Sequence, residues 1–134
     1  MDRSLKFYRG VLGLEPMFEP QEASGESFEK ATHIPGAKFK FTMLKIGNGH
    51  TFIELIQFLN PKAKPNQLTI SDTGAPHVAF RVDNIDEAKA ELESKGVKFN
   101  SEPVRIPAGP LKGRSFVYFK DPDGLTLELF QELK

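Results

Sequence analysis

The sequence predicts an α+β protein made of two similar halves, and two observations carry this prediction. Short helical patterns alternate with strand patterns, and nearly the same order of elements occurs twice along the 134 residues. The apolar fraction of 39%, with 12 Phe, is enough to form a buried core. We expect the halves to span residues 1–62 and 63–134 and to form one structural domain together.

The first half begins with a helical pattern. Leu5, Tyr8 and Leu12 recur at helical spacing, and Gly13 follows as a stop signal. Further on, Gly47-Asn48-Gly49 marks a hairpin turn between two apolar segments. The expected elements are a helix over 2–12, a strand near 14–18, a mobile loop to 36, and strands over 39–46 and 51–58.

The second half repeats this order and adds a strand at its start. Asp83 and Asn84 offer helix caps, and the helix that follows is expected to end at Gly96. Asp121-Pro122-Asp123-Gly124 has the composition of a type I turn. The expected elements are strands over 76–82, 97–100, 115–119 and 125–130, a helix ending at 96, and a Pro/Gly loop over 106–113.

Composition and charge exclude several classes of function. Lys plus Arg and Asp plus Glu are 18 each, so a net positive field for nucleic-acid or membrane binding is missing. The chain has no Cys, which excludes disulfides and thiolate chemistry. No signal-peptide pattern or apolar stretch of membrane-spanning length occurs, and we expect a soluble cytoplasmic protein.

Two glutamates occupy matching positions in apolar strands. Glu54 and Glu128 each precede a Leu in the last strand of their half, and both strands are apolar on both faces. A carboxylate in such surroundings is costly to desolvate unless a cation or a proton accompanies it. His77 lies in a similar strand, so the three side chains predict an open site for one divalent metal: Zn, Ni, Co, Fe or Mn.

Other interpretations of these residues remain open. Arg81, on the same strand face as His77, is a rival partner for either glutamate, and Glu54 has a lysine as an alternative partner. His33 and His50 are expected at the surface. Lys112 and Arg114 flank Gly113 in a loop that could close over an anionic substrate or simply be solvated. No nucleophile elbow or phosphate-binding loop occurs.

Three motifs resemble the vicinal oxygen chelate superfamily, which includes glyoxalases, bleomycin resistance proteins and extradiol dioxygenases. They are the segment from Asp2 to Leu14, His77-Val78-Ala79-Phe80, and the segment from Phe119 to Leu129. The resemblance implies two βαβββ modules whose curved mixed sheet surrounds a metal. It places ligands at Glu54, His77 and Glu128. A fourth ligand would lie on a first strand that the sequence lacks ahead of residue 1, and a homodimer is expected.

The resemblance also implies a function. The pattern is closest to glyoxalase-like members, which suggests a metal-dependent lyase or isomerase acting on a small substrate with vicinal oxygens through an enediolate. Glu128 and Glu54 would transfer the proton, and Phe52, Phe58 and Phe130 would line the pocket. Thr73 stands where glutathione-binding members often carry arginine. The alternatives are an Fe(II)-dependent extradiol-type dioxygenase and a non-enzymatic small-molecule binding or resistance protein.

Overall fold

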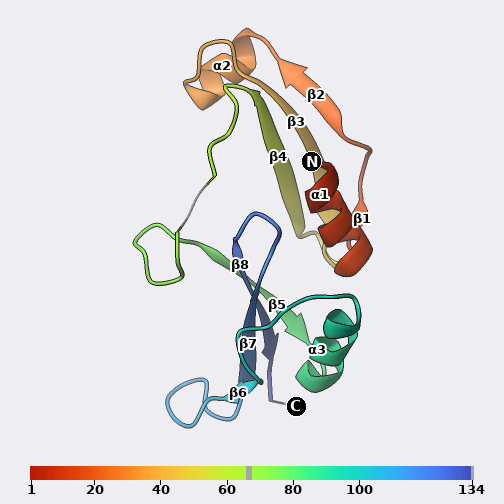
Figure 1. The fold of residues 1–134 in the computed structure, drawn as a ribbon, viewed down its shortest axis with the longest axis vertical. Coiled ribbons are helices and arrows are strands. Elements are labelled where there is room, and N and C mark those ends of the chain that lie inside the picture. Colours follow the sequence, from red (N-terminus) through yellow and green to blue (C-terminus); the bar gives the residue numbers. More distant parts are fainter. Residues whose placement is uncertain (66–67, 134) are drawn as a thin grey trace. The chain divides into compact units, whose positions relative to one another are not determined.

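The computed structural model describes residues 1–65 and 68–133 and divides into two compact units, Met1–Pro65 and Asn66–Lys134. Residues 66, 67 and 134 of the expected second half lie outside the described residues. Within those described, the strands form two four-stranded sheets, one in each unit (Figure 1). The predicted α+β class with two similar halves is therefore confirmed. No helix in the described part of the chain has the length and apolarity needed to cross a bilayer.

The first unit is built around a central long strand. Its elements are α1 (Asp2–Leu5), the π-helix η1 (Lys6–Val11), β1 (Glu15–Pro16), β2 (Gln21–Ser24), α2 (Glu26–Thr32), β3 (Lys38–Lys45) and β4 (Phe52–Asn60). The strands β1, β2 and β4 all pair antiparallel with β3. Because β4 pairs with β3 along its whole length, β1 and β2 share the other edge of β3.

The core of the first unit is formed by residues of the N-terminal helix and of β3. The predicted helix continues from α1 into a π-helical turn, in which the Leu12 amide donates to the Phe7 carbonyl at 2.9 Å. Tyr8 is 2% exposed and Leu44 is fully buried. The hydroxyl of buried Thr42 donates to the Phe18 carbonyl at 2.6 Å, which satisfies a polar group inside the core.

The prediction of a mobile loop up to residue 36 was wrong. This stretch contains β2 and α2, which continue the sheet and cover part of it. The ring of Phe28 in α2 packs edge-on against Phe39 of β3, with 5.3 Å between ring centroids. Each element is short and rich in Glu and Ser, so periodicity alone did not reveal them, and the contacts with β3 stabilise both.

The second unit has a strand that the first unit lacks. Its elements are β5 (His77–Val82), α3 (Ile85–Ser94), β6 (Val104–Arg105), β7 (Ser115–Lys120) and β8 (Thr126–Gln131). The sheet order is β5-β8-β7-β6. The β5–β8 pair is parallel, while β8–β7 and β7–β6 are antiparallel. In place of the predicted strand over 97–100, the structure has a single β-bridge between Phe99 and Phe119. The strand that pairs with the outer edge of β7 is β6, a few residues later in the chain.

Helix α3 covers one face of this sheet. The Asn84 side chain accepts hydrogen bonds from the amides of Asp86 and Glu87, which caps the helix start as predicted. Gly96, at φ +89°, ends it. The covered face carries alternate residues of β7 and β8, so it is almost fully buried: Val117, Phe119, Leu127 and Leu129 are each at most 3% exposed.

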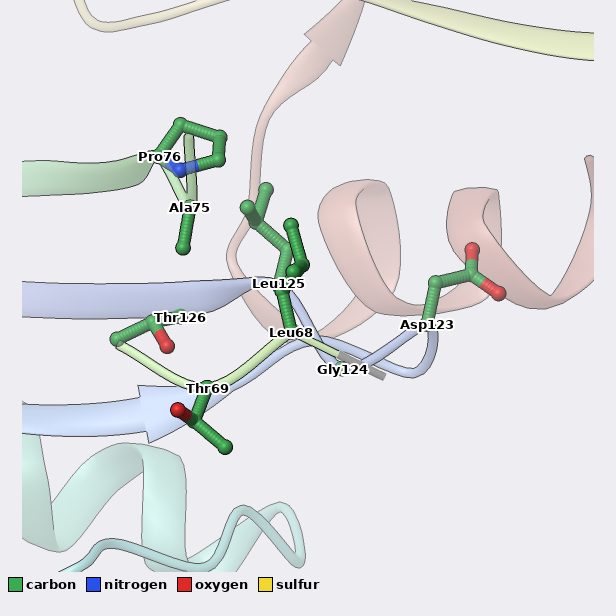
Figure 2. A pocket seen from close by; sticks show the side chains of 8 residues that line it. All are labelled: Leu68, Thr69, Ala75, Pro76, Asp123, Gly124, Leu125 and Thr126. Carbon is green, nitrogen blue, oxygen red and sulfur yellow. The ribbon is translucent and has the colours of Figure 1, made fainter. Parts of the chain in front are cut away.

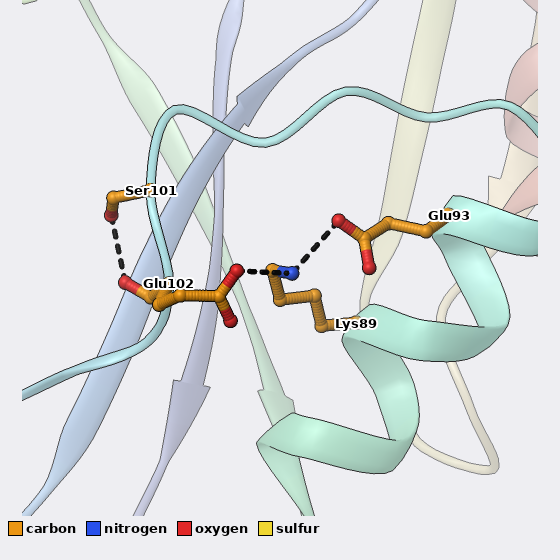
Figure 3. A network of polar contacts seen from close by, with 4 residues as sticks. All are labelled: Lys89, Glu93, Ser101 and Glu102. Atoms are coloured by element: carbon orange, nitrogen blue, oxygen red, sulfur yellow. Dashed lines mark hydrogen bonds and ion pairs between the residues drawn. The ribbon is translucent and has the colours of Figure 1, made fainter.

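A buried lysine anchors α3 to the following loop. Lys89 is 7% exposed, and its ammonium contacts Glu93 at 2.8 Å and Glu102 at 3.1 Å (Figure 3). The same nitrogen lies 5.7 Å from the centroid of the Phe99 ring. The hydrogen bond to Glu93 is the main cause that raises the pKa of Lys89. The network therefore joins the helix to the loop that leads into β6.

Candidate functional site

The face of the second sheet that points away from α3 carries the polar residues of the candidate site. The pairing places His77 opposite Thr126, and Ala79 opposite Glu128. On the other side of β8, Glu128 lies opposite Tyr118. Since paired residues in neighbouring strands share a face, His77, Glu128 and Tyr118 all project from this one surface.

His77 and Glu128 are in direct contact. The His77 Nε2 atom lies 3.3 Å from Oε2 of Glu128, and the two side chains are 43% and 10% exposed. The imidazole is therefore open to solvent while the carboxylate is largely buried. Sequence reasoning predicted that these two residues meet, and the parallel β5–β8 pairing brings them together.

Burial changes the acidity of Glu128. Desolvation raises the pKa of this carboxyl group, and the nearby His77 opposes that effect in part. Burial disfavours the ionised carboxylate of Glu128. A nearby cation would stabilise the ionised form, and binding of a proton would remove the charge. The prediction of a costly buried carboxylate is thus met at Glu128.

Tyr118 is a site residue that the sequence analysis missed. Its ring meets the His77 ring edge-on, with 5.8 Å between centroids. Burial raises the pKa of the Tyr118 hydroxyl, and the charge of Glu128 raises it further. The signal was present, because folding the hairpin about the Asp121–Gly124 turn places residue 118 opposite residue 128.

Glu54 has different surroundings in the first unit. It lies opposite Met43 in the β3–β4 pair and is exposed. On the same strand face, Phe52 and Ile56 are each 49% exposed. Although β4 is apolar on this face as well, the face is exposed, unlike the surroundings of Glu128.

The phenylalanines expected to line a pocket have distinct environments. Phe58 is half-buried and packs against Phe39, with ring centroids 5.4 Å apart. Phe52 is the most exposed of the three. Phe130 is half-buried and lies opposite Phe116 on the face that carries Glu128. Their role in binding a substrate stays a prediction.

The cations considered in the sequence analysis lie apart from Glu128. Within the second unit, Arg81 pairs with Glu132 at 3.4 Å and not with Glu128, the rival partner that the sequence suggested. Arg114 donates from Nη1 to the Pro110 carbonyl at 3.0 Å and thereby helps to close its own loop. Lys112 is exposed in that loop, and His33 and His50 are exposed as expected.

The paired donors suit a divalent metal. An imidazole nitrogen and a carboxylate oxygen are ligands of Zn²⁺ and related ions, at about 2.0–2.2 Å each. The 3.3 Å between Nε2 of His77 and Oε2 of Glu128 is a spacing that two adjacent ligands of one such ion would have. Within residues 1–65 and 68–133, no cluster of three or more His, Cys, Asp or Glu side chains is formed. Glu54 as a third ligand stays a prediction.

The two helix–sheet units and the His–Glu pair define a class of α+β proteins with one four-stranded sheet in each unit. The sequence matches the family described as the Glyoxalase/Bleomycin resistance protein/Dioxygenase superfamily over residues 1–129. The chain belongs to this family. The resemblance seen in the sequence motifs, to the vicinal oxygen chelate superfamily, is thereby confirmed.

Individual relatives agree with this assignment. A 2-epi-5-epi-valiolone epimerase from Actinomyces sp is 30% identical over 132 residues, covering 96% of this chain and 72% of that protein. A lactoylglutathione lyase from Schizosaccharomyces pombe is 32% identical and covers 98% of this chain, but only 44% of its own length is matched. The crystal structure of a glyoxalase family protein from Bacillus cereus has a TM-score of 0.80 at 24% identity, covering 100% of this chain and 87% of that one.

Proposed function

We propose that the protein is a metal-dependent lyase or isomerase that moves a proton next to a carbonyl group in a small substrate with vicinal oxygens. The contact of largely buried Glu128 with solvent-accessible His77 is the observation that supports this most directly. The similarity to an epimerase and to a lactoylglutathione lyase is compatible with it.

His77 and Glu128 would hold the metal, with Glu54 as the proposed third ligand. When bound, the metal supplies a Lewis acid that polarises the substrate carbonyl. Imidazole and carboxylate groups bind Zn, Ni, Co, Mn and Fe alike, so these ligands do not select one metal among the five.

Glu128 would act as the general base. Its carboxylate would take the proton from the carbon beside the carbonyl and return it to the neighbouring carbon, passing through an enediolate. A base works best when its pKa approaches the working pH, and burial moves the pKa of Glu128 upward in that direction. His77, at 3.3 Å, would keep the carboxylate oriented. Glu54 would be its counterpart in the first unit.

Metal stoichiometry tests the ligand assignment. The protein is equilibrated with Zn²⁺, Ni²⁺ or Co²⁺, freed of excess metal, and assayed by elemental analysis. We expect about one metal per chain in wild type and a clear loss in His77→Ala and Glu128→Gln. Glu132→Gln is the matched control, because this exposed glutamate on the same segment pairs with Arg81 instead. Equal stoichiometry in all variants would refute the assignment.

Proton exchange tests the chemistry separately. Dihydroxyacetone, which has vicinal oxygens, is incubated with metal-loaded protein in D₂O and followed by NMR. Wild type should speed deuterium incorporation, and Glu128→Gln should lose about 10²–10⁴-fold, the usual contribution of a general base. Oxygen uptake with catechol by the iron-loaded protein would instead favour the dioxygenase. Ligand binding that a chelator leaves unchanged, without exchange, would favour the binding protein.

A further inference from the structure

A small pocket lies at the end of the second sheet where β5 and β8 begin. Its volume is about 210 Å³, and Figure 2 shows the side chains that line it. The residues that matter for its chemistry come from the segment before β5 and from the start of β8: Leu68, Thr69, Ala75, Pro76, Leu125 and Thr126. We refer to it as the β5–β8 pocket.

Two residues that line this pocket neighbour the His77–Glu128 pair in sequence or in strand register. Pro76 directly precedes His77, and Thr126 lies opposite His77 in the β5–β8 register. Thr126 is also two residues before Glu128 on the same face of β8. Two residues along a strand span about 7 Å, so one small molecule is long enough to reach both places.

The wall formed by the segment before β5 is held in place by its own hydrogen bonds. The Asp72 carboxylate accepts from the Thr69 amide at 2.6 Å and from the Thr69 hydroxyl at 2.9 Å. The Ala75 amide donates to the Asp72 carbonyl at 3.1 Å. Asp72 is thus hydrogen-bonded to both Thr69 and Ala75, and these bonds fix the conformation of the segment that forms this wall.

The lining favours a compact neutral group. Leu68, Ala75, Pro76 and Leu125 supply apolar surface, which favours an uncharged occupant. Engineered apolar cavities of about 150 Å³ bind benzene, so the β5–β8 pocket has room for one ring or a short branched alkyl chain. A nucleotide or a peptide side chain with a long charged end would not suit it.

We propose that the β5–β8 pocket is a specificity subsite that takes a compact, neutral, apolar substituent of the substrate. The inference rests on the proposed function, in which the vicinal oxygens of the same substrate lie at His77 and Glu128. It names the substrate class more closely: a small compound with vicinal oxygens that carries a ring or a short alkyl group a few bonds away.

Hydroxamates test the subsite, because their two adjacent oxygens chelate divalent metals. Affinities of acetohydroxamate and benzohydroxamate for the metal-loaded protein are measured by calorimetry. We expect wild type to prefer benzohydroxamate by about tenfold, the effect of burying a ring's apolar surface in part. Ala75→Phe should fill the pocket and abolish the preference, and Ala75→Leu should reduce it. Ala108→Phe, an equal change at an exposed loop position, should leave it intact.

The two hydroxamates separate the subsite from the proposed function. Metal-dependent binding of acetohydroxamate, which lacks the ring, reports on the metal site alone. If it binds and the ring preference is absent in wild type or survives in Ala75→Phe, the subsite is refuted while the proposed function stands.

A metal-free measurement covers the case in which acetohydroxamate does not bind. Benzyl alcohol is titrated into the protein, and the methyl signals of Leu68 and Leu125 are followed by NMR. Saturable shifts in wild type, lost in Ala75→Leu and kept in Ala108→Phe, would support the pocket even though the proposed function had failed. Absence of such shifts in wild type, or equal shifts in Ala75→Leu, would refute it.

Discussion

The last strands of the two units, β4 and β8, carry the same Glu-Leu pair in different surroundings. Strand β8 lies between β5 and β7, and Glu128 is 7% exposed. In the part of the chain that the structure describes, β4 pairs with β3 alone, and Glu54 is exposed. A strand's own sequence therefore does not determine how deeply its carboxylate is buried. The more deeply buried carboxylate is the one whose strand is paired on both edges.

This difference predicts which apolar side chains of the two strands matter most for stability. Aligning Glu54 with Glu128 aligns Ile53 with Leu127, which is fully buried, whereas Ile53 is half-buried. Leu127→Ala should lower the free energy of unfolding by about 3–5 kcal/mol, the range for a buried Leu. Ile53→Ala should cost about 1–2 kcal/mol, because it leaves a smaller cavity.

Chemical denaturation of both variants provides the measurement, with the slope of each transition checked against wild type. Because the chain contains two compact units, transitions are followed by unit-specific NMR signals as well as by circular dichroism. If Leu127→Ala and Ile53→Ala lowered the free energy of unfolding equally, the pairing of β5 with β8 would not contribute to the burial of Leu127.

The two glutamates should also differ in how their removal affects the metal-free protein. Burial disfavours the ionised form of Glu128, so Glu128→Gln should increase the free energy of unfolding at neutral pH. The gain should exceed the roughly 0.5 kcal/mol typical of surface substitutions. Glu54→Gln, at an exposed position, should stay within that smaller range.

The pH dependence of this gain has a defined sign. A raised pKa in the folded state means that protonated Glu128 favours folding below its unfolded pKa, and that this contribution is lost as pH rises through the folded pKa. The advantage of Glu128→Gln should therefore be small in acid, below the ordinary value of 4.5, and grow toward neutral pH. Thermal denaturation across this range measures it, and an advantage that shrinks as pH rises would contradict the assignment.

Another small effect is expected for the buried lysine of α3, Lys89. Lys89 is 7% exposed, while its partner Glu102 is 86% exposed in its side chain and remains solvated if the lysine is lost. Lys89→Met should thus change the free energy of unfolding by no more than about 1 kcal/mol, since the apolar stem is preserved. A loss of about 3 kcal/mol or more would show that the ion pairs hold α3 in place. Urea denaturation settles the value.

Both the element order and part of the site followed from local patterns in the sequence. Turn residues such as Asp121 and Gly124, the cap at Asn84 and the period of the strands indicated most helices and strands. These features depend on neighbours within a few residues, so a single sequence reveals them. The same patterns indicated that Glu128 is set in an apolar strand near His77.

Only the tertiary structure decided which edges are paired and which faces are covered. It showed that β5 runs parallel beside β8, that Tyr118 belongs to the His77–Glu128 surface, and that the face of β4 carrying Glu54 is open. It also revealed β2 and α2, which are too short to form without contacts to β3. The physical reason is common to all of these: burial and pairing depend on segments distant in the chain, and no local window of sequence contains that information.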